Sequence, residues 1–353
     1  MSIVAEDFPV VVGVDTHARS NTYAIITTRT GARLDAAAFP SSQAGIARAL
    51  SWIMRRCQGV RPLLVIEGIG SYGAALARAA AGQGLEVVEP LPYSPRRRGP
   101  KNDTIDAEAI GRSVVGVEEA LLRRPRSHDA IRTGLRVLVV AREELNAERT
   151  RSINALTALV RSVDLGLDAR RALSGSQIST IARWRARSED LGLAKARAES
   201  IRLARRIISA DEELDRNRIE LAELVAASGS AHLLDEVGIG AVNAAVILVA
   251  WSHGGRIRSE AAFASLSGTC PIPASSGNTS RHRLNRGGDR RLNRALSSIA
   301  LTRMSHDPET RAYVERRRSE GKTSKEIRRS LKRYIARQVY RSLSNPPEIA
   351  LAT

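Results

Sequence analysis

The stretch PVVVGV at residues 9–14, followed directly by Asp15 and Thr16, decides the fold of the first part of the chain. It is short, apolar and rich in valine, which is typical of a buried β-strand. Outward from it, the sequence predicts further strands at residues 21–28, 33–39, 63–66 and 85–89, and helices at 43–56, 72–82 and 103–116. Three successive strands followed by alternating helices and strands indicate an α/β domain with a mixed sheet.

The chain changes character after about residue 128. Residues 128–226 are rich in Arg, Glu, Ala and Leu, with apolar residues at helical spacings and breaks near Gly166 and Gly192. This pattern predicts at least two long antiparallel helices that form a coiled-coil-like arm. Its expected role is spacing or self-association.

The last third of the chain is predicted to be helical again. Residues 237–240 (VGIG) lie between two helical stretches, which is typical of a helix-hairpin-helix whose glycine turn approaches a DNA phosphate. A simple tight turn before a helix is the alternative interpretation. We therefore expect an α/β domain at residues 1–118, a helical arm at 119–227 and a helical C-terminal domain with the helix-hairpin-helix at 228–353.

Positive charge is concentrated near the C-terminus. The chain has 55 Lys and Arg against 37 Asp and Glu, a net charge of +18, and residues 281–341 alone hold 19 basic and 6 acidic residues. Such a concentration attracts polyanions, which favours nucleic-acid binding over a merely solvated surface. Aromatic residues make up only 3%, which argues against a protein that binds single strands by base stacking.

Several protein classes are disfavoured by composition. Cys57 and Cys270 lie far apart and match neither a disulfide framework nor a zinc finger. No run of about 18 apolar residues is present, so we expect no membrane span. The opening sequence MSIVAEDFPVVVGVDTH is unlike a secretory signal, and we expect a cytoplasmic protein.

Four acidic residues stand where strands end or a helix begins. Asp15 follows the first predicted strand and Glu67 the fourth, while Asp103 and Asp106 share one face of a helix start. Each alone could be a turn or helix-capping residue. Together they offer the hard carboxylate oxygens that Mg²⁺ ions require, so the combination predicts a metal site.

These segments resemble a known family. VGVDTH, VIEG and KNDTIDAEAIGR resemble the RuvC-like domain of the DEDD transposases of bacterial insertion sequences, in the family numbered one hundred and ten, described as bridge-RNA-guided recombinases. VGIGAVNAAVILVAW, FASLSGTCPIPASSGN and RGGDRRLNRAL resemble the C-terminal transposase domain of that family. The resemblance covers roughly residues 9–116 and 228–340.

The resemblance implies an RNase H/RuvC-like fold and a specific chemistry. It implies that Asp15, Glu67, Asp103 and Asp106 form a catalytic tetrad that holds Mg²⁺ or Mn²⁺. It also implies that Ser276 attacks a DNA phosphodiester and forms a phosphoserine intermediate, with the adjacent Ser275 as the alternative nucleophile. The partners it implies are donor and target DNA, a structured guide RNA, and further copies of the chain in a dimer or tetramer.

Two groups of basic residues are predicted to contact nucleic acid because they flank these catalytic candidates. The first group precedes the helix of Asp103 and the second surrounds the serine. They are Arg96, Arg97, Arg98 and Lys101, and Arg281, Arg283, Arg286, Arg290, Arg291 and Arg294.

The leading functional hypothesis is an RNA-guided DNA transposase or recombinase. One alternative is a metal-dependent, structure-specific endonuclease of RuvC type, which needs the four acids but not Ser276. Another is a non-catalytic DNA-binding protein built from the helix-hairpin-helix and the basic tail. Only the first hypothesis predicts DNA covalently linked to the protein.

Overall fold

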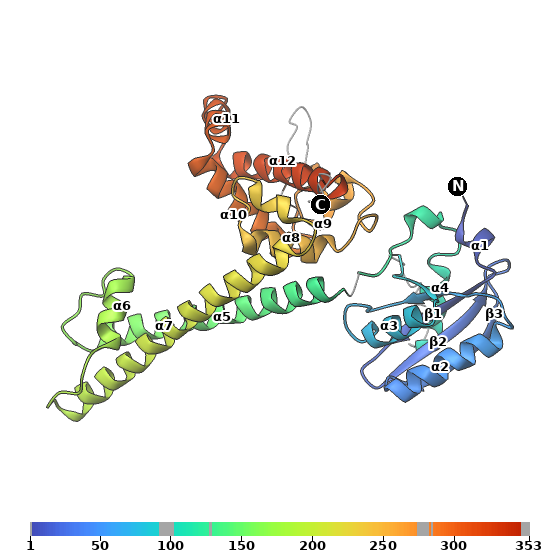
Figure 1. Cartoon of the computed structure of the whole chain (residues 1–353), viewed down its shortest axis with the longest axis horizontal. Helices are drawn as coiled ribbons and strands as arrows, with labels where there is room; N and C mark the ends of the chain where they lie inside the picture. The colour runs from blue at the N-terminus through green and yellow to red at the C-terminus, as the bar shows by residue number, and fades with distance from the viewer. Residues whose placement is uncertain (1, 92–101, 127–128, 274–281, 284, 347–353) are drawn as a thin grey trace, which may run out of the picture. The chain divides into compact units, whose positions relative to one another are not determined.

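The computed structural model describes residues 2–91, 102–126, 129–273, 282–283 and 285–346. The chain divides into two compact units, Met1–Ser127 and His128–Thr353, and each is described by itself (Figure 1). Within the described ranges, no helix combines the length and apolar character needed to cross a membrane.

The first unit is built on a five-stranded mixed sheet with the strand order β3-β2-β1-β4-β5. The first three strands pair antiparallel, and β1, β4 and β5 run parallel. Their bounds are β1 Val10–Thr16, β2 Ser20–Thr27, β3 Arg33–Pro40, β4 Leu63–Ile66 and β5 Glu86–Val88. This mixed sheet confirms the α/β prediction and fits the RNase H-like fold that the resemblance implies.

Helices cover both faces of this sheet. Helices α2 (Gln43–Arg56) and α3 (Ala74–Gly82) pack on one face, and α1 (Val4–Asp7) and α4 (Asp103–Arg112) belong to the apolar cluster on the other. A short 3₁₀ helix, η1 (Glu119–Leu121), follows α4. Coverage of both faces explains why every residue of β1 is buried and why its sequence is continuously apolar up to Asp15.

Helix α4 lies directly against β1 because two glycines remove the side chains between them. A Cβ on Gly13 would lie 2.0 Å from the Ala107 carbonyl oxygen and 2.4 Å from the Gly111 nitrogen. The side chain of Asn102, not that of Asp103, caps the helix by accepting a hydrogen bond from the Thr104 amide at 2.9 Å. The Asp103 carboxylate is therefore not used as the helix cap.

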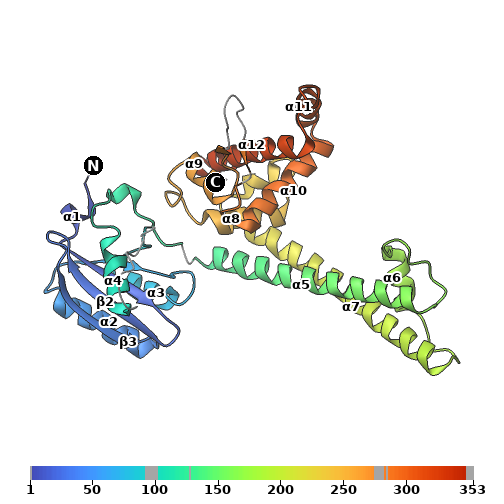
Figure 2. The same cartoon turned by 180° about the vertical axis from the view of Figure 1, so that it is seen from behind.

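In the second unit, α5 (Ala130–Ser162) and α7 (Leu191–Ala226) run antiparallel, side by side in both views (Figure 2). The register follows from the Asn217 amide, which donates to the Leu138 carbonyl at 3.0 Å, and from the ion pair of Arg149 with Asp211. Helix α6 (Gly175–Ala182) packs against one end of this pair in an apolar cluster of its own. That the arm is a coiled coil remains a prediction.

The other end of the helix pair enters the core of the C-terminal helices. Leu135 and Val139 of α5 and Leu221 and Val225 of α7 share one apolar cluster with these helices. The predicted arm and the predicted C-terminal domain thus have a core in common, and the division at 227/228 remains a prediction. The helices are α8 Ala241–Trp251, α9 Glu260–Leu266, α10 Arg290–His306, α11 Pro308–Ser319 and α12 Ser324–Ser344.

The glycine turn at residues 237–240 joins a 3₁₀ helix, η2 (Ala231–Asp235), to α8. Gly238 has a φ of 82°, a conformation that favours glycine, so the turn chemistry is as expected from the sequence. Because the element before the turn is a short 3₁₀ helix, the helix-hairpin-helix remains a prediction.

Candidate metal site and nucleic-acid surface

Asp15 and Glu67 lie side by side because they end adjacent parallel strands. Val14 of β1 is in register with Ile66 of β4, and the Glu67 amide donates to the Val14 carbonyl at 3.1 Å. The Thr16 hydroxyl donates to the Glu67 carbonyl at 3.0 Å and ties the two strand ends together. The carboxyl ends of parallel strands commonly form ligand sites at such an edge.

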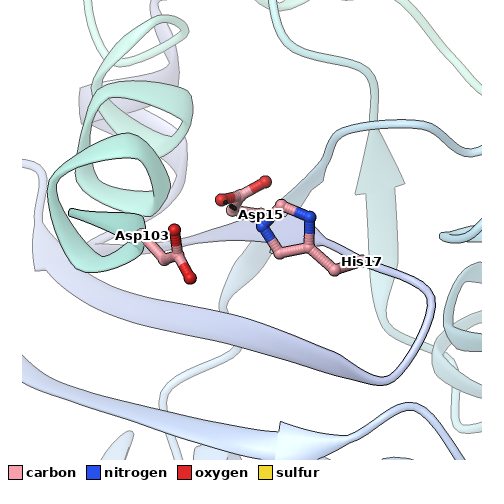
Figure 3. Close-up of side chains that lie close together, drawn as sticks. All are labelled: Asp15, His17 and Asp103. Carbon is pink, nitrogen blue, oxygen red and sulfur yellow. Dashed lines mark hydrogen bonds and ion pairs between the residues drawn. The ribbon is translucent and has the colours of Figure 1, made fainter. Parts of the chain in front are cut away.

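Asp15, His17 and Asp103 bring three potential ligand atoms together (Figure 3). One ligand atom from each residue lies within 4.8 Å of the other two. The His17 Nε2 lies 3.1 Å from the Asp15 Oδ2. Asp15 is buried, His17 is half-buried and Asp103 is exposed, so the group is accessible from one side.

The pKa values of Asp15 and Glu67 respond to the other predicted carboxylates. Burial raises the pKa of Asp15, the nearby carboxylates of Asp103 and Asp106 also raise it, and His17 lowers it. Burial likewise raises the pKa of Glu67, with Asp15 and Asp106 adding to the effect. Mutual repulsion of this kind is relieved by a bound cation.

The residues fit a divalent metal ion. The carboxylate oxygens match Mg²⁺ and Mn²⁺, while an imidazole nitrogen is more typical of a transition-metal ligand. The sequence-based set did not include His17. The available signal was the Asp-x-His spacing at the end of β1, because side chains two residues apart point to the same side of a strand.

The structure places only part of the predicted nucleic-acid surface. Five of the basic residues and both candidate nucleophiles lie outside the described residues: Arg96, Arg97, Arg98, Lys101 and Arg281, and Ser275 and Ser276. Arg283, Arg286 and Arg290 are described and exposed.

The remaining two predicted contacts, Arg291 and Arg294 of α10, have an acidic neighbour. Both pair with Glu143 of α5, at nitrogen–oxygen distances of 2.7 and 2.6 Å. A phosphate would therefore compete with Glu143 for these two guanidinium groups.

Comparisons with known proteins point to one family. A family model for DEDD transposases of the IS110 type matches residues 12–163, and a model described as the transposase IS116/IS110/IS902 family matches residues 230–315. The chain is 29% identical to a 42 kDa protein of the insertion element IS900 from Mycobacterium paratuberculosis, over 89% of this chain and 90% of that protein. A stretch of 88 residues is 42% identical to a 43.6 kDa protein of the insertion element IS110 from Streptomyces coelicolor, covering 24% of this chain and 22% of that protein.

The first model covers the acidic cluster, and the second covers α8, α9, α10 and the first part of α11. On these matches, the chain belongs to the DEDD transposases of the IS110 family of insertion sequences.

Proposed function

We propose that this transposase cuts and rejoins DNA strands through a covalent bond between DNA and Ser276, assisted by a divalent metal ion at the acidic cluster. The observation that carries the proposal is the convergence of Asp15 and Asp103, with Glu67 and Asp106 close enough to affect their neighbours' pKa values. Membership of a transposase family makes DNA the expected substrate.

The proposed chemistry is a pair of transesterifications. The Ser276 oxygen attacks a DNA phosphorus, its proton passes to a base, and one bond between phosphorus and a sugar oxygen breaks to release a hydroxyl. The hydroxyl of a second strand then attacks the phosphoserine, which restores the serine and joins the new strands. No oxidant or reductant is needed, and the number of phosphodiester bonds is conserved.

The acidic residues have a binding role in this scheme. Asp15, Asp103, Glu67 and Asp106 would hold the cation, with His17 as a further ligand on the same side of β1. A Mg²⁺ or Mn²⁺ ion bound there would supply Lewis-acid stabilisation of oxygen atoms at the reacting phosphate. A serine hydroxyl is a weak nucleophile without activation, and the sequence offers no Ser-His-Asp arrangement at a usable spacing.

The proposed partners follow from the resemblance to the family. They are donor and target DNA, a structured guide RNA, and further copies of the chain, because exchanging strands requires at least two cuts. The concentration of basic residues at 281–341 supports the nucleic-acid partners.

The test is denaturing electrophoresis of the protein after reaction with end-labelled DNA. A labelled protein band is expected for the parent and for Ser275→Ala, and no such band for Ser276→Ala or Asp15→Asn. If Ser276→Ala cuts DNA at the parent rate while Asp15→Asn does not, the protein is a metal-dependent endonuclease instead. If the parent protein itself leaves the DNA unchanged, the protein only binds it.

A further inference from the structure

A strongly basic cleft is formed by helix α12 and by segments that flank the proposed serine. Its volume is about 1010 Å³, at the upper end of the roughly 300–1,000 Å³ range of pockets that enclose a drug-sized ligand. Eight Lys or Arg side chains line it, against a single acidic residue, Glu326. The cleft therefore has the size and the charge to hold a segment of a polyanion.

The basic residues of α12 form a stripe along one face of the helix. Lys325, Arg329, Lys332, Arg333 and Arg337 follow one another at spacings of four, three, one and four residues, and all line the cleft. Like charges on successive helical turns repel one another. Such a stripe destabilises the helix unless an anion lies along it.

The carboxylates of the protein neutralise only part of this stripe. Glu260 pairs with Arg333 and Arg337, at 3.1 and 2.7 Å. The Glu326 carboxylate is used by the helix cap, where it accepts a hydrogen bond from the Thr323 amide at 2.9 Å. Lys325 and Arg329 form no ion pair with any residue that the structure describes.

Lys332 is the most unusual member of the stripe. Its side chain is buried, with 7% of the residue exposed, and its ammonium group donates to the Asn293 Oδ1 at 2.9 Å. The amide nitrogen of Asn293 in turn donates to the Ser267 carbonyl at 2.6 Å, which orients the Asn293 oxygen toward the lysine. The ammonium thus has a neutral partner and, within the described part of the chain, no carboxylate.

A buried charge normally has an opposite charge beside it, because removing an ion from water without compensation is costly. An ammonium group has three donors, and the contact with Asn293 uses one of them. The Nη1 of Arg333, one residue away, is also buried and has no partner among the described atoms. Both residues belong to the lining of the cleft, and an anionic oxygen bound beside them would offer the missing hydrogen-bond acceptor.

Residues that flank the segment of Ser276 in the sequence line the cleft. Strands β6 (Ile272–Pro273) and β7 (His282–Arg283) pair antiparallel, with Ile272 in register with Arg283. The wall of the cleft includes residues 268–271, directly before β6, and Arg283 and Asn285 at the other side of the hairpin. A strand bound in the cleft would pass beside the base of this hairpin.

We propose that the cleft binds the sugar–phosphate backbone of a nucleic-acid strand, with Lys332 donating a hydrogen bond to a phosphate oxygen. Lys325 and Arg329 of the stripe contact the same backbone. Only the assignment of this strand as the one attacked by Ser276 rests on the function proposed above.

The first test compares two double variants of equal charge in the full-length protein. Lys325→Ala/Arg329→Ala removes two charges from the cleft, and Arg311→Ala/Arg318→Ala removes two exposed charges from α11, outside it. Fluorescence anisotropy is measured at several salt concentrations with a labelled single-stranded DNA and an RNA of the same sequence. The cleft variant should bind more weakly, with a slope of log affinity against log salt smaller by about 1.4, and the control should keep the parent slope.

The second test addresses Lys332. Lys332→Met keeps the length of the side chain and removes the charge, and it should weaken binding about tenfold or more, whereas Lys332→Arg should retain most of the affinity. All variants also carry Ser276→Ala, so the assay measures binding without any DNA chemistry. A failure of the covalent mechanism would therefore leave this result unchanged.

The two nucleic acids identify the strand. If the variants lose affinity only for DNA, the cleft binds a DNA strand. If they lose affinity only for RNA, the cleft binds the guide. Either result supports the proposal. Parent affinity and parent salt slope in both the double cleft variant and Lys332→Met, with both probes, would overturn it.

Discussion

The backbone of Gly13 in β1 lies against the backbone of Gly111 in α4, with no side chain between them. A Cβ on Gly111 would lie 3.1 Å from the Gly13 nitrogen and 2.8 Å from the Ile26 Cδ1. This contact fixes the distance between helix and strand, and it brings Asp103, at the start of α4, over the strand end that carries Asp15.

We expect Gly13→Ala to disturb the acidic cluster without changing any of its residues. The added methyl group would force α4 away from β1, and overpacking of this kind typically costs about 1–3 kcal/mol of unfolding free energy. Urea denaturation should show this loss, and Mn²⁺ binding should weaken. Gly82→Ala is the matched control, because a Cβ at Gly82 meets nothing within 4 Å. Equal stability of the two variants would contradict the role of the close contact.

A second prediction concerns His17 as a metal ligand. His17→Ala should reduce Mn²⁺ affinity about tenfold, equivalent to about 1.4 kcal/mol, because one of three close ligand atoms is lost. Titration calorimetry with Mn²⁺ measures this directly, and His306→Ala, an exposed histidine of α10, should bind like the parent. If His17→Ala also binds like the parent, His17 only orients Asp15.

Metal binding should also stabilise the fold. An ion that binds only the folded chain adds about 2.7 kcal/mol to the unfolding free energy at a concentration one hundred times its dissociation constant. We expect this increase in the parent and its absence in Asp103→Asn, measured by thermal unfolding with and without Mn²⁺. A similar increase in Asp103→Asn would place the ion elsewhere.

Lys332 gives a pH-dependent prediction. Burial lowers the pKa of Lys332 below its usual value of 10.5, and Arg328 and Arg329 lower it further. The folded chain therefore binds fewer protons than the unfolded chain as the pH approaches 10.5 from below, so the penalty for burying the ammonium decreases as the pH rises. The unfolding free energy of the parent, relative to Lys332→Met, should increase with pH up to about 10.5 in urea titrations. A difference that stays constant with pH would contradict the burial of a charged lysine.

The arm should contribute to self-association. Both paired helices expose apolar side chains, including Val137 and Val140 of α5, which are 57% and 40% exposed, and Ile219 of α7, which is 51% exposed. Val137→Asp/Val140→Asp should reduce the mass measured by light scattering, whereas Leu191→Asp, at the start of α7, should not. A parent protein that is monomeric both alone and with DNA and RNA would exclude an arm-mediated dimer or tetramer.

Much of the first unit could be predicted from local sequence. Helix α2 and strand β4 have the predicted bounds, because an amphipathic stretch and a short apolar run are strong local signals. The prediction for α4 was wrong at its end, since the helix stops at Arg112 rather than at residue 116. The amides of Val4 and Ala5 donate to the Val117 and Val115 carbonyls, so long-range hydrogen bonds replace a further helical turn.

The site and the second unit were harder to predict, because their partners are distant in the sequence. The proximity of His17 to Asp103 depends on the packing of α4 against β1, which spacing alone does not reveal. Leu135 and Leu221 lie on helices whose apolar spacing predicts that they pack on each other. In the structure they also share a core with the C-terminal helices. The sequence shows the basic stripe of α12 only as a local excess of positive charge. The contact of Lys332 with the neutral side chain of Asn293 joins two helices, so it appears only in the folded chain.

The length of the paired helices limits how far apart the second unit can hold two bound molecules. With 33 residues in α5 and about 1.5 Å of rise per residue, the hairpin is about 50 Å long. B-form DNA rises about 3.4 Å per base pair, so this length corresponds to about 15 base pairs, or roughly one and a half duplex turns. Because an apolar cluster fixes each end, molecules bound near α6 and at the C-terminal helices would be held at a constant separation somewhat shorter than this length.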